Sequence, residues 1–222
     1  RRSSDLDVTK YSNSCFVPVY YWAHAFIALD WFRYAKHPPM ETLADPKYKF
    51  LIYNRAWSGT REYRLKFLDL LVKFKLSNYC QTSFNPTDPE DGLNYQNHSW
   101  RNTGFKPTIQ LEDHFNPTTV LSSASADFYI NDYVSTDFEV VLETLFDDQR
   151  NHLTEKTLRP IACNKPFILA ATPFSLQYLR RYGFKTFDGL IDESYDTVID
   201  PLQRLQAIVR ELKRISLLSA DA

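Results

Sequence analysis

Residues 138–143, Phe-Glu-Val-Val-Leu-Glu, decide the fold together with two stretches that follow them. Residues 152–161 read His-Leu-Thr-Glu-Lys-Thr-Leu-Arg-Pro-Ile, and residues 166–171 read Pro-Phe-Ile-Leu-Ala-Ala. Two short apolar runs on either side of a polar turn and a helical segment predict a strand, a helix and a second strand. Such a βαβ unit builds a parallel sheet, and open parallel sheets bind ligands at the carboxyl ends of their strands.

Glu155 and Lys156 fall at this expected ligand edge. A carboxylate can accept hydrogen bonds from both hydroxyls of a ribose, and an ammonium near the start of a helix can neutralise a phosphate. The pair therefore suits a sugar nucleotide. The alternative is structural: Thr154 caps the helix, Glu155 favours its first turn through the helix dipole, and Lys156 is solvated.

The rest of the chain predicts further elements of the same kind of fold. A first strand is expected over residues 47–54, and helices over residues 62–76, 173–183 and 201–217. Residues 184–192 read as a strand or an extended piece. This order of elements predicts an α/β fold, a Rossmann-like parallel sheet flanked by helices, for residues 46–222.

Two parts of the chain depart from that pattern. Residues 1–45 form an N-terminal segment with one expected helix, and residues 81–125 form a long irregular insertion rich in Asn, Pro, Asp, Thr and Ser. Long insertions in compact domains are usually functional loops. An acceptor site could be lined by the aromatic and basic side chains of the insertion, because stacking surfaces beside positive charge suit single bases. We single out Tyr95, His98, Trp100 and Arg101, and the alternative for the aromatics is that they anchor the loop to the domain.

Three arginines, Arg55, Arg61 and Arg64, cluster around the turn from the first strand to the first helix of the sheet. A planar guanidinium suits bidentate contact with a phosphate, and phosphates are commonly held in this loop. The turn has no G-x-G-x-x-G pattern, so it does not predict a nicotinamide-type site. The alternative is that the arginines form a solvated helix start.

Composition and charge limit the class of protein. The chain has 222 residues, of which 44% are apolar, which indicates a folded protein with one substantial core. A net charge of −1 gives no general attraction to nucleic acid, so contact with DNA would need a local basic face. No apolar run is long enough to span a membrane.

The cysteines and histidines give no sign of a disulfide framework or of a metal site. Three widely spaced cysteines without a Cys-x-x-Cys pair favour a reducing, cytoplasmic setting. His114 has no partner at metal-ligand spacing. We therefore expect no protein-held metal.

The segment FEVVLETLFDDQRNHLTEKTLRPIACNKPFIL, residues 138–169, resembles the donor-binding region of α1,3/α1,4-fucosyltransferases. It is even more similar to a group of phage-encoded glycosyltransferase-like proteins. The motifs shared with that group are Thr-Glu-Lys-Thr at 154–157, Lys-Pro-Phe-Ile at 165–168, Gly-Phe-Lys-Thr-Phe-Asp at 183–188 and Asp-Glu-Ser-Tyr-Asp at 192–196. The last motif could be a functional acidic cluster or a set of caps that order a loop.

The resemblance implies a GT-B type glycosyltransferase with a nearly complete donor domain, in which residues 1–45 are a remnant of the acceptor part or a partial acceptor part. It implies no cofactor beyond a nucleotide-sugar donor. Tyr53-Asn54 followed by Arg61 looks like the family's diphosphate-binding pattern, and Arg64 is the second choice for the arginine that contacts the diphosphate. By the same resemblance and the chemistry above, the expected donor-binding residues are Asn54, Arg55, Arg61, Arg64, Glu143, Thr154, Glu155 and Lys156, with Glu143 in the sugar pocket.

The acceptor and the catalytic base are less well defined. The phage-like group points to hydroxymethylated cytosine in DNA as the acceptor, and Asp30, His24 and His114 are candidates for the base. Three alternatives stay open: an enzyme acting on a glycan, a non-catalytic nucleotide-binding module, and a structural phage protein that uses the fold as a scaffold.

Overall fold

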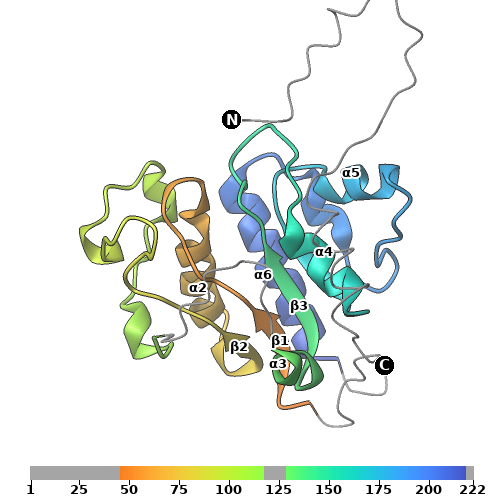
Figure 1. The fold of residues 1–222 in the computed structure, drawn as a ribbon, viewed down its shortest axis with the longest axis horizontal. Coiled ribbons are helices and arrows are strands. Elements are labelled where there is room, and N and C mark those ends of the chain that lie inside the picture. The colour runs from red at the N-terminus through yellow and green to blue at the C-terminus, as the bar shows by residue number, and fades with distance from the viewer. Residues whose placement is uncertain (1–45, 118–128, 219–222) are drawn as a thin grey trace, which may run out of the picture.

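The computed structural model describes residues 46–117 and 129–218, which are built around a four-stranded parallel sheet (Figure 1). The strands are β1 (Tyr48–Ile52), β2 (Cys80–Thr82), β3 (Thr136–Leu142) and β4 (Phe167–Ala170), in the order β2-β1-β3-β4. All three pairs of neighbours are parallel. The predicted α/β fold with a parallel sheet is confirmed. The chain builds outward from β1 in both directions, so its topology reverses between β1 and β3.

The two faces of the sheet differ in character. Phe50, Ile52 and Leu142 belong to the main apolar core, which also holds the buried apolar side chains of α2 (Tyr63–Lys73) and α6 (Pro201–Ser216). Leu51, which points to the opposite face, belongs to a small cluster with Tyr133 and Cys163. The helices α3 (Ile130–Val134) and α4 (Glu155–Ala162) contact β3 on this second side. Figure 1 shows β3 crossing in front of α6, with α4 beside it.

The second face of the sheet carries a buried charged network. Arg159 of α4 forms an ion pair with Glu139 of β3, and its Nε donates to the hydroxyl of Tyr133 at 3.0 Å. The guanidinium also lies over the ring of Tyr53, 4.7 Å from its centroid. Because buried charges need such partners, these contacts fix α4 and α3 against the sheet.

Most of the expected elements are present, with small shifts at their ends. The helix α5 (Ser175–Arg181) lies within the expected range 173–183. Residues 184–192 form no strand, and only an isolated bridge joins Asp188 to Ile191. The strand β2 was not predicted, because three residues give no periodic signal. The helix expected in residues 1–45 lies outside the described residues.

The described part of the insertion, residues 83–117, is held against α2 and the turn before it by three buried carboxylates. Asp88 accepts hydrogen bonds from the backbone N–H groups of Trp57 and Ser58 at 2.5 and 2.7 Å. Asp69 of α2 accepts two hydrogen bonds from Thr108, one from its backbone N–H at 3.1 Å and one from its hydroxyl at 2.9 Å. The third carboxylate, Glu62, contacts residues 98–102. The insertion is irregular, as expected, and short 3-10 helices are its regular elements: η4 (Tyr95–Asn97), η5 (Thr103–Phe105) and η6 (Leu111–Asp113).

The acidic motif at residues 192–196 orders local structure. Asp196 accepts from the backbone N–H groups of Leu176 and Gln177 at 3.0 and 3.3 Å, in the first turn of α5. Asp192 caps the 3-10 helix η7 (Glu193–Thr197) by accepting from the backbone N–H of Ser194. The capping interpretation of this motif is confirmed.

Candidate functional site at the carboxyl edge of the sheet

Two turns meet at the carboxyl edge of the sheet, one from β1 to α2 and one from β3 to α4. They lie side by side because β1 and β3 are paired neighbours. Ligands of open α/β sheets bind in the crevice where the strand order reverses, and here that point lies between these two strands. The predicted donor-binding residues all belong to the two turns or to the helices that follow them.

In the β3–α4 turn, Glu143 anchors the start of α4. This fully buried carboxylate accepts from the backbone N–H of Thr154 at 2.8 Å, from its hydroxyl at 2.7 Å and from the Thr157 hydroxyl at 2.6 Å. Thr154 in turn caps α4 by accepting from the backbone N–H of Lys156 at 3.3 Å. The capping role considered for Thr154 is therefore confirmed. The place of Glu143 in a sugar pocket stays a prediction, and its carboxylate here faces the helix.

Glu155 and Lys156 form an ion pair with each other. The Lys156 ammonium lies 2.8 Å from Oε1 of Glu155 and also donates to the Thr154 hydroxyl at 3.3 Å. Glu155 is buried, and the Lys156 side chain is 17% exposed. A phosphate and a ribose that bound here would have to exchange this internal contact for contacts of their own.

Arg55 and Arg61 come together as expected, around a carboxylate of the insertion. Arg61 makes a bidentate contact with Glu90, with 2.8 Å between Nη1 and Oε1. Arg55 donates to the same Glu90 Oε1 at 3.1 Å. This contact lowers the pKa of Glu90, first through the hydrogen bond from Arg61. Both cations are therefore compensated by the insertion.

Arg64 is different, because it is buried inside the carboxyl edge. Its Nη1 donates to the carbonyl of Ala56 at 2.5 Å, and its Nη2 donates to the carbonyls of Leu142 and Glu143 at 2.7 and 3.2 Å. Burial lowers the pKa of Arg64. The guanidinium thus ties the β1–α2 turn to the end of β3. Since the side chain of Glu143 holds the start of α4, Arg64 and Lys156 lie at the same edge of the sheet.

Buried polar atoms without a hydrogen-bond partner gather around the β1–α2 turn. Within residues 46–117 and 129–218, the side-chain atoms in this state are Nδ2 and Oδ1 of Asn54, Nε of Arg64, Oγ1 of Thr82, Nδ1 of His98 and Nε1 of Trp100. Asn54 is 1% exposed, and both atoms of its amide are unmatched. Leaving a buried polar group unmatched costs about 1–3 kcal/mol, so each needs an explanation. Sequence reasoning found Asn54 but missed Thr82, since β2 itself gave no signal.

Three of the predicted acceptor residues, Tyr95, His98 and Trp100, are packed against other side chains. Tyr95 is buried, and its hydroxyl donates to Glu112 at 2.5 Å. The His98 ring stands edge-on to the rings of Trp57 and Trp100, with centroids 5.0 and 5.1 Å apart. Trp57 and Trp100 stack on each other, with centroids 6.3 Å apart. These contacts fit the anchoring alternative for the aromatic side chains.

The other candidates lie at the surface or outside the described residues. The side chains of Arg101 and His114 are exposed on the insertion. His24 and Asp30, both considered as the catalytic base, fall in residues 1–45, outside the described part of the chain. The described residues include no group of three or more His, Cys, Asp or Glu side chains that could hold a metal ion. Among the helices of residues 46–117 and 129–218, none is both long and apolar enough to cross a membrane.

Comparisons with known proteins give no relative: no family model, no curated protein and no solved structure matches the chain.

Proposed function

We propose that the protein binds a nucleotide sugar at the carboxyl edge of the sheet and transfers the sugar to an acceptor hydroxyl. The observation that supports this most directly is the buried, unmatched amide of Asn54 beside the turn that Arg64 closes. Both residues follow β1, at the reversal of strand order where open α/β sheets take nucleotides. A bound ligand would supply the missing hydrogen bonds.

The chemistry of the two side chains suits a diphosphate. The Asn54 amide offers two N–H donors and an acceptor, and Arg64 has an unmatched Nε–H. The described hydrogen bonds of Arg64 go to carbonyl oxygens, which carry no formal charge and do not compensate the cation. A preorganised cation at the leaving group lowers the barrier to breaking a sugar–phosphate bond. In this proposal Arg64, rather than Arg61, is the main arginine that contacts the diphosphate.

Glu155 and Lys156 complete the proposed site from the opposite turn. Lys156 provides a second cation for the diphosphate, and Glu155 accepts from the hydroxyls of the ribose. Ligand binding would separate the ion pair that the two residues make with each other. The acceptor that we propose from the motif resemblance is hydroxymethylated cytosine in DNA, and a glycan is the alternative acceptor.

The competing proposal is a nucleotide-binding module without catalysis. It is favoured by the internal pairing of Arg61 with Glu90 and of Lys156 with Glu155, which leaves fewer cations to stabilise a departing diphosphate. This module would bind a nucleotide at Asn54 and Arg64 but would not consume a nucleotide sugar.

A binding and release experiment tests both proposals. The protein is mixed with UDP- and GDP-linked sugars, alone or with unmodified DNA, hydroxymethylated DNA or an oligosaccharide. Calorimetry measures binding, and chromatography measures the free nucleotide. Release that depends on hydroxymethylated DNA supports the transferase, release that depends on the oligosaccharide moves the acceptor to a glycan, and binding without release supports the module. Absence of binding to every nucleotide sugar would overturn both proposals.

A further inference from the structure

His98 and Glu62 form a largely buried histidine–carboxylate pair at the start of α2, in which the His98 side chain is 9% exposed. Glu62 is 2% exposed and accepts from Nε2 of His98 at 2.9 Å and from the backbone N–H groups of Arg101 and Asn102 at 2.9 and 3.0 Å. Three donors fix the carboxylate in place. Because a carboxylate accepts hydrogen bonds, it selects the form of the imidazole with a proton on Nε2. In the neutral ring, Nδ1 is then an acceptor.

The second nitrogen of this histidine has no partner, and neither does its aromatic neighbour. Nδ1 of His98 and Nε1 of Trp100 are both buried without a hydrogen bond in the part of the chain that the structure describes. The two rings are neighbours, with centroids 5.1 Å apart. One offers an acceptor and the other an N–H donor. A hydroxyl group complements this arrangement, because its oxygen can accept from Trp100 while its proton is donated to His98.

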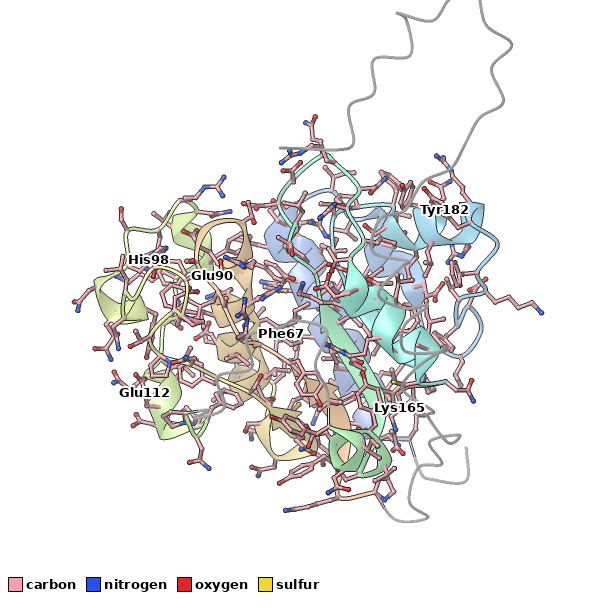
Figure 2. The ribbon with its side chains drawn as sticks, viewed as in Figure 1. Phe67, Glu90, His98, Glu112, Lys165 and Tyr182 are labelled. Carbon is pink, nitrogen blue, oxygen red and sulfur yellow. The ribbon has the colours of Figure 1, made fainter. Side chains whose placement is uncertain are left out.

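The same turn connects this pair to the proposed donor site. Trp57, which contacts both rings, lies between Asn54 and Glu62 in the β1–α2 turn. His98 and Glu90 (Figure 2) both come from the insertion, and they contact the adjacent residues Glu62 and Arg61. Trp57 is fully buried, and its ring and that of Trp100 pack against the His98 ring and hold it in place.

We propose that His98 is the general base of the transfer and that Glu62 positions it, a role that rests on the proposed glycosyltransferase function. The acceptor hydroxyl gives its proton to Nδ1 of His98 while its oxygen bonds to the anomeric carbon of the donor sugar. The bond from that carbon to the diphosphate oxygen breaks, and the nucleotide leaves with the electron pair. Glu62 stabilises the imidazolium that results, and Trp100 donates to the acceptor oxygen.

The test compares variants of the full chain in the transfer assay, with the acceptor that the panel of DNA and oligosaccharide identifies. We expect His98→Gln to lower kcat by about 10²–10⁴-fold, the usual contribution of a general base, with an unchanged Kd for the nucleotide sugar. Glu62→Gln should lower kcat less and leave the Kd unchanged. Glu112→Gln is the matched control, because Glu112 is a carboxylate of the insertion that accepts a hydrogen bond from the hydroxyl of Tyr95.

A second readout separates catalysis from folding. His98→Gly should regain part of its rate when imidazole is added, and Trp100→Phe should raise the KM for the acceptor more than it lowers kcat. Transfer by His98→Gln at the wild-type rate would overturn the role of His98 and leave the proposed function standing. Loss of activity without imidazole rescue, in variants that fold, would show a structural role only. If the wild-type protein binds no nucleotide sugar, both proposals fall together.

Discussion

The two turns at the carboxyl edge have the same topology, since each leaves a parallel strand and enters a helix. They differ in whether their buried polar side chains have hydrogen-bond partners. In the β3–α4 turn, Glu143 takes three donors from the first turn of α4. In the β1–α2 turn, the Asn54 amide is buried and unmatched. The turn with the more conspicuous motif, Thr-Glu-Lys, is thus the one that is internally complete. Unmatched groups that a ligand could bind are therefore found in the β1–α2 turn, whereas a ligand at Lys156 would have to replace an existing contact.

The largest effect expected from this comparison is the loss of the anchor in the β3–α4 turn. Glu143→Ala leaves the buried donors of Thr154 and Thr157 unmatched and creates a cavity, so we expect the free energy of unfolding to fall by about 3–5 kcal/mol. Urea unfolding followed by circular dichroism measures this. Glu112→Ala, which removes a partly exposed carboxylate with one described hydroxyl partner, should cost far less. Equal costs for the two variants would contradict the anchoring role.

The opposite behaviour is expected in the β1–α2 turn. Asn54→Ala removes no side-chain hydrogen bond within the described residues, so the free energy of unfolding should change by less than about 1 kcal/mol. The Kd for the nucleotide sugar should rise at least about tenfold, a loss of about 1.4 kcal/mol. Asn94→Ala is the control, because Asn94 caps a 3-10 helix of the insertion by accepting from Gln96 at 3.0 Å. An affinity that Asn54→Ala leaves unchanged would place the ligand elsewhere.

Acid should open the β1–α2 turn through Asp88. Burial raises the pKa of this carboxyl, but the backbone N–H groups of Ser58, Glu90 and Trp57 outweigh it and hold the pKa below its ordinary value. A lowered pKa in the folded state contributes stability above the unfolded value of about 3.9, and this contribution is lost as the pH falls through the folded value. Protection of the Ser58 amide from hydrogen exchange should therefore decrease below about pH 3.9. Asp88→Asn should show reduced protection already at pH 6, and an acid-independent protection in the wild type would contradict this assignment.

The smallest effect is expected from Glu90, which compensates two arginines of the β1–α2 turn. The side chain of Glu90 is 39% exposed, so Glu90→Gln should change the free energy of unfolding by about 0–1 kcal/mol. If Arg61 reaches the donor once it no longer pairs with Glu90, the affinity for the nucleotide sugar should rise by up to about fivefold, which corresponds to about 1 kcal/mol. Calorimetry at low salt measures the change. An unaltered affinity would remove Arg61 from the site.

The sequence predicted those features that depend on local pattern. The strand β4 is a continuous apolar run, β1 and β3 each end in one, the helix α6 has a clear amphipathic period, and Thr154 stands at a recognisable cap position. What could not be predicted depends on pairing between distant residues. Nothing near Arg61 in the sequence indicates that its partner is Glu90, 29 residues away. The same holds for Glu143, whose contacts with Thr154 and Thr157 require the loop between them to fold back.

The sheet order also has a consequence for how the chain folds during synthesis. On one side β1 pairs with β2, where Phe50 lies opposite Cys80. On the other side it pairs with β3, where Tyr48 lies opposite Thr136, a residue that is synthesised much later. At about 5–20 residues per second, β1 leaves the ribosome several seconds before its second partner. During that time one side of β1 is an open edge, which invites pairing with other chains. A ribosome that stalls between the two partners would therefore hold a half-built sheet with an open strand edge, a form prone to aggregate.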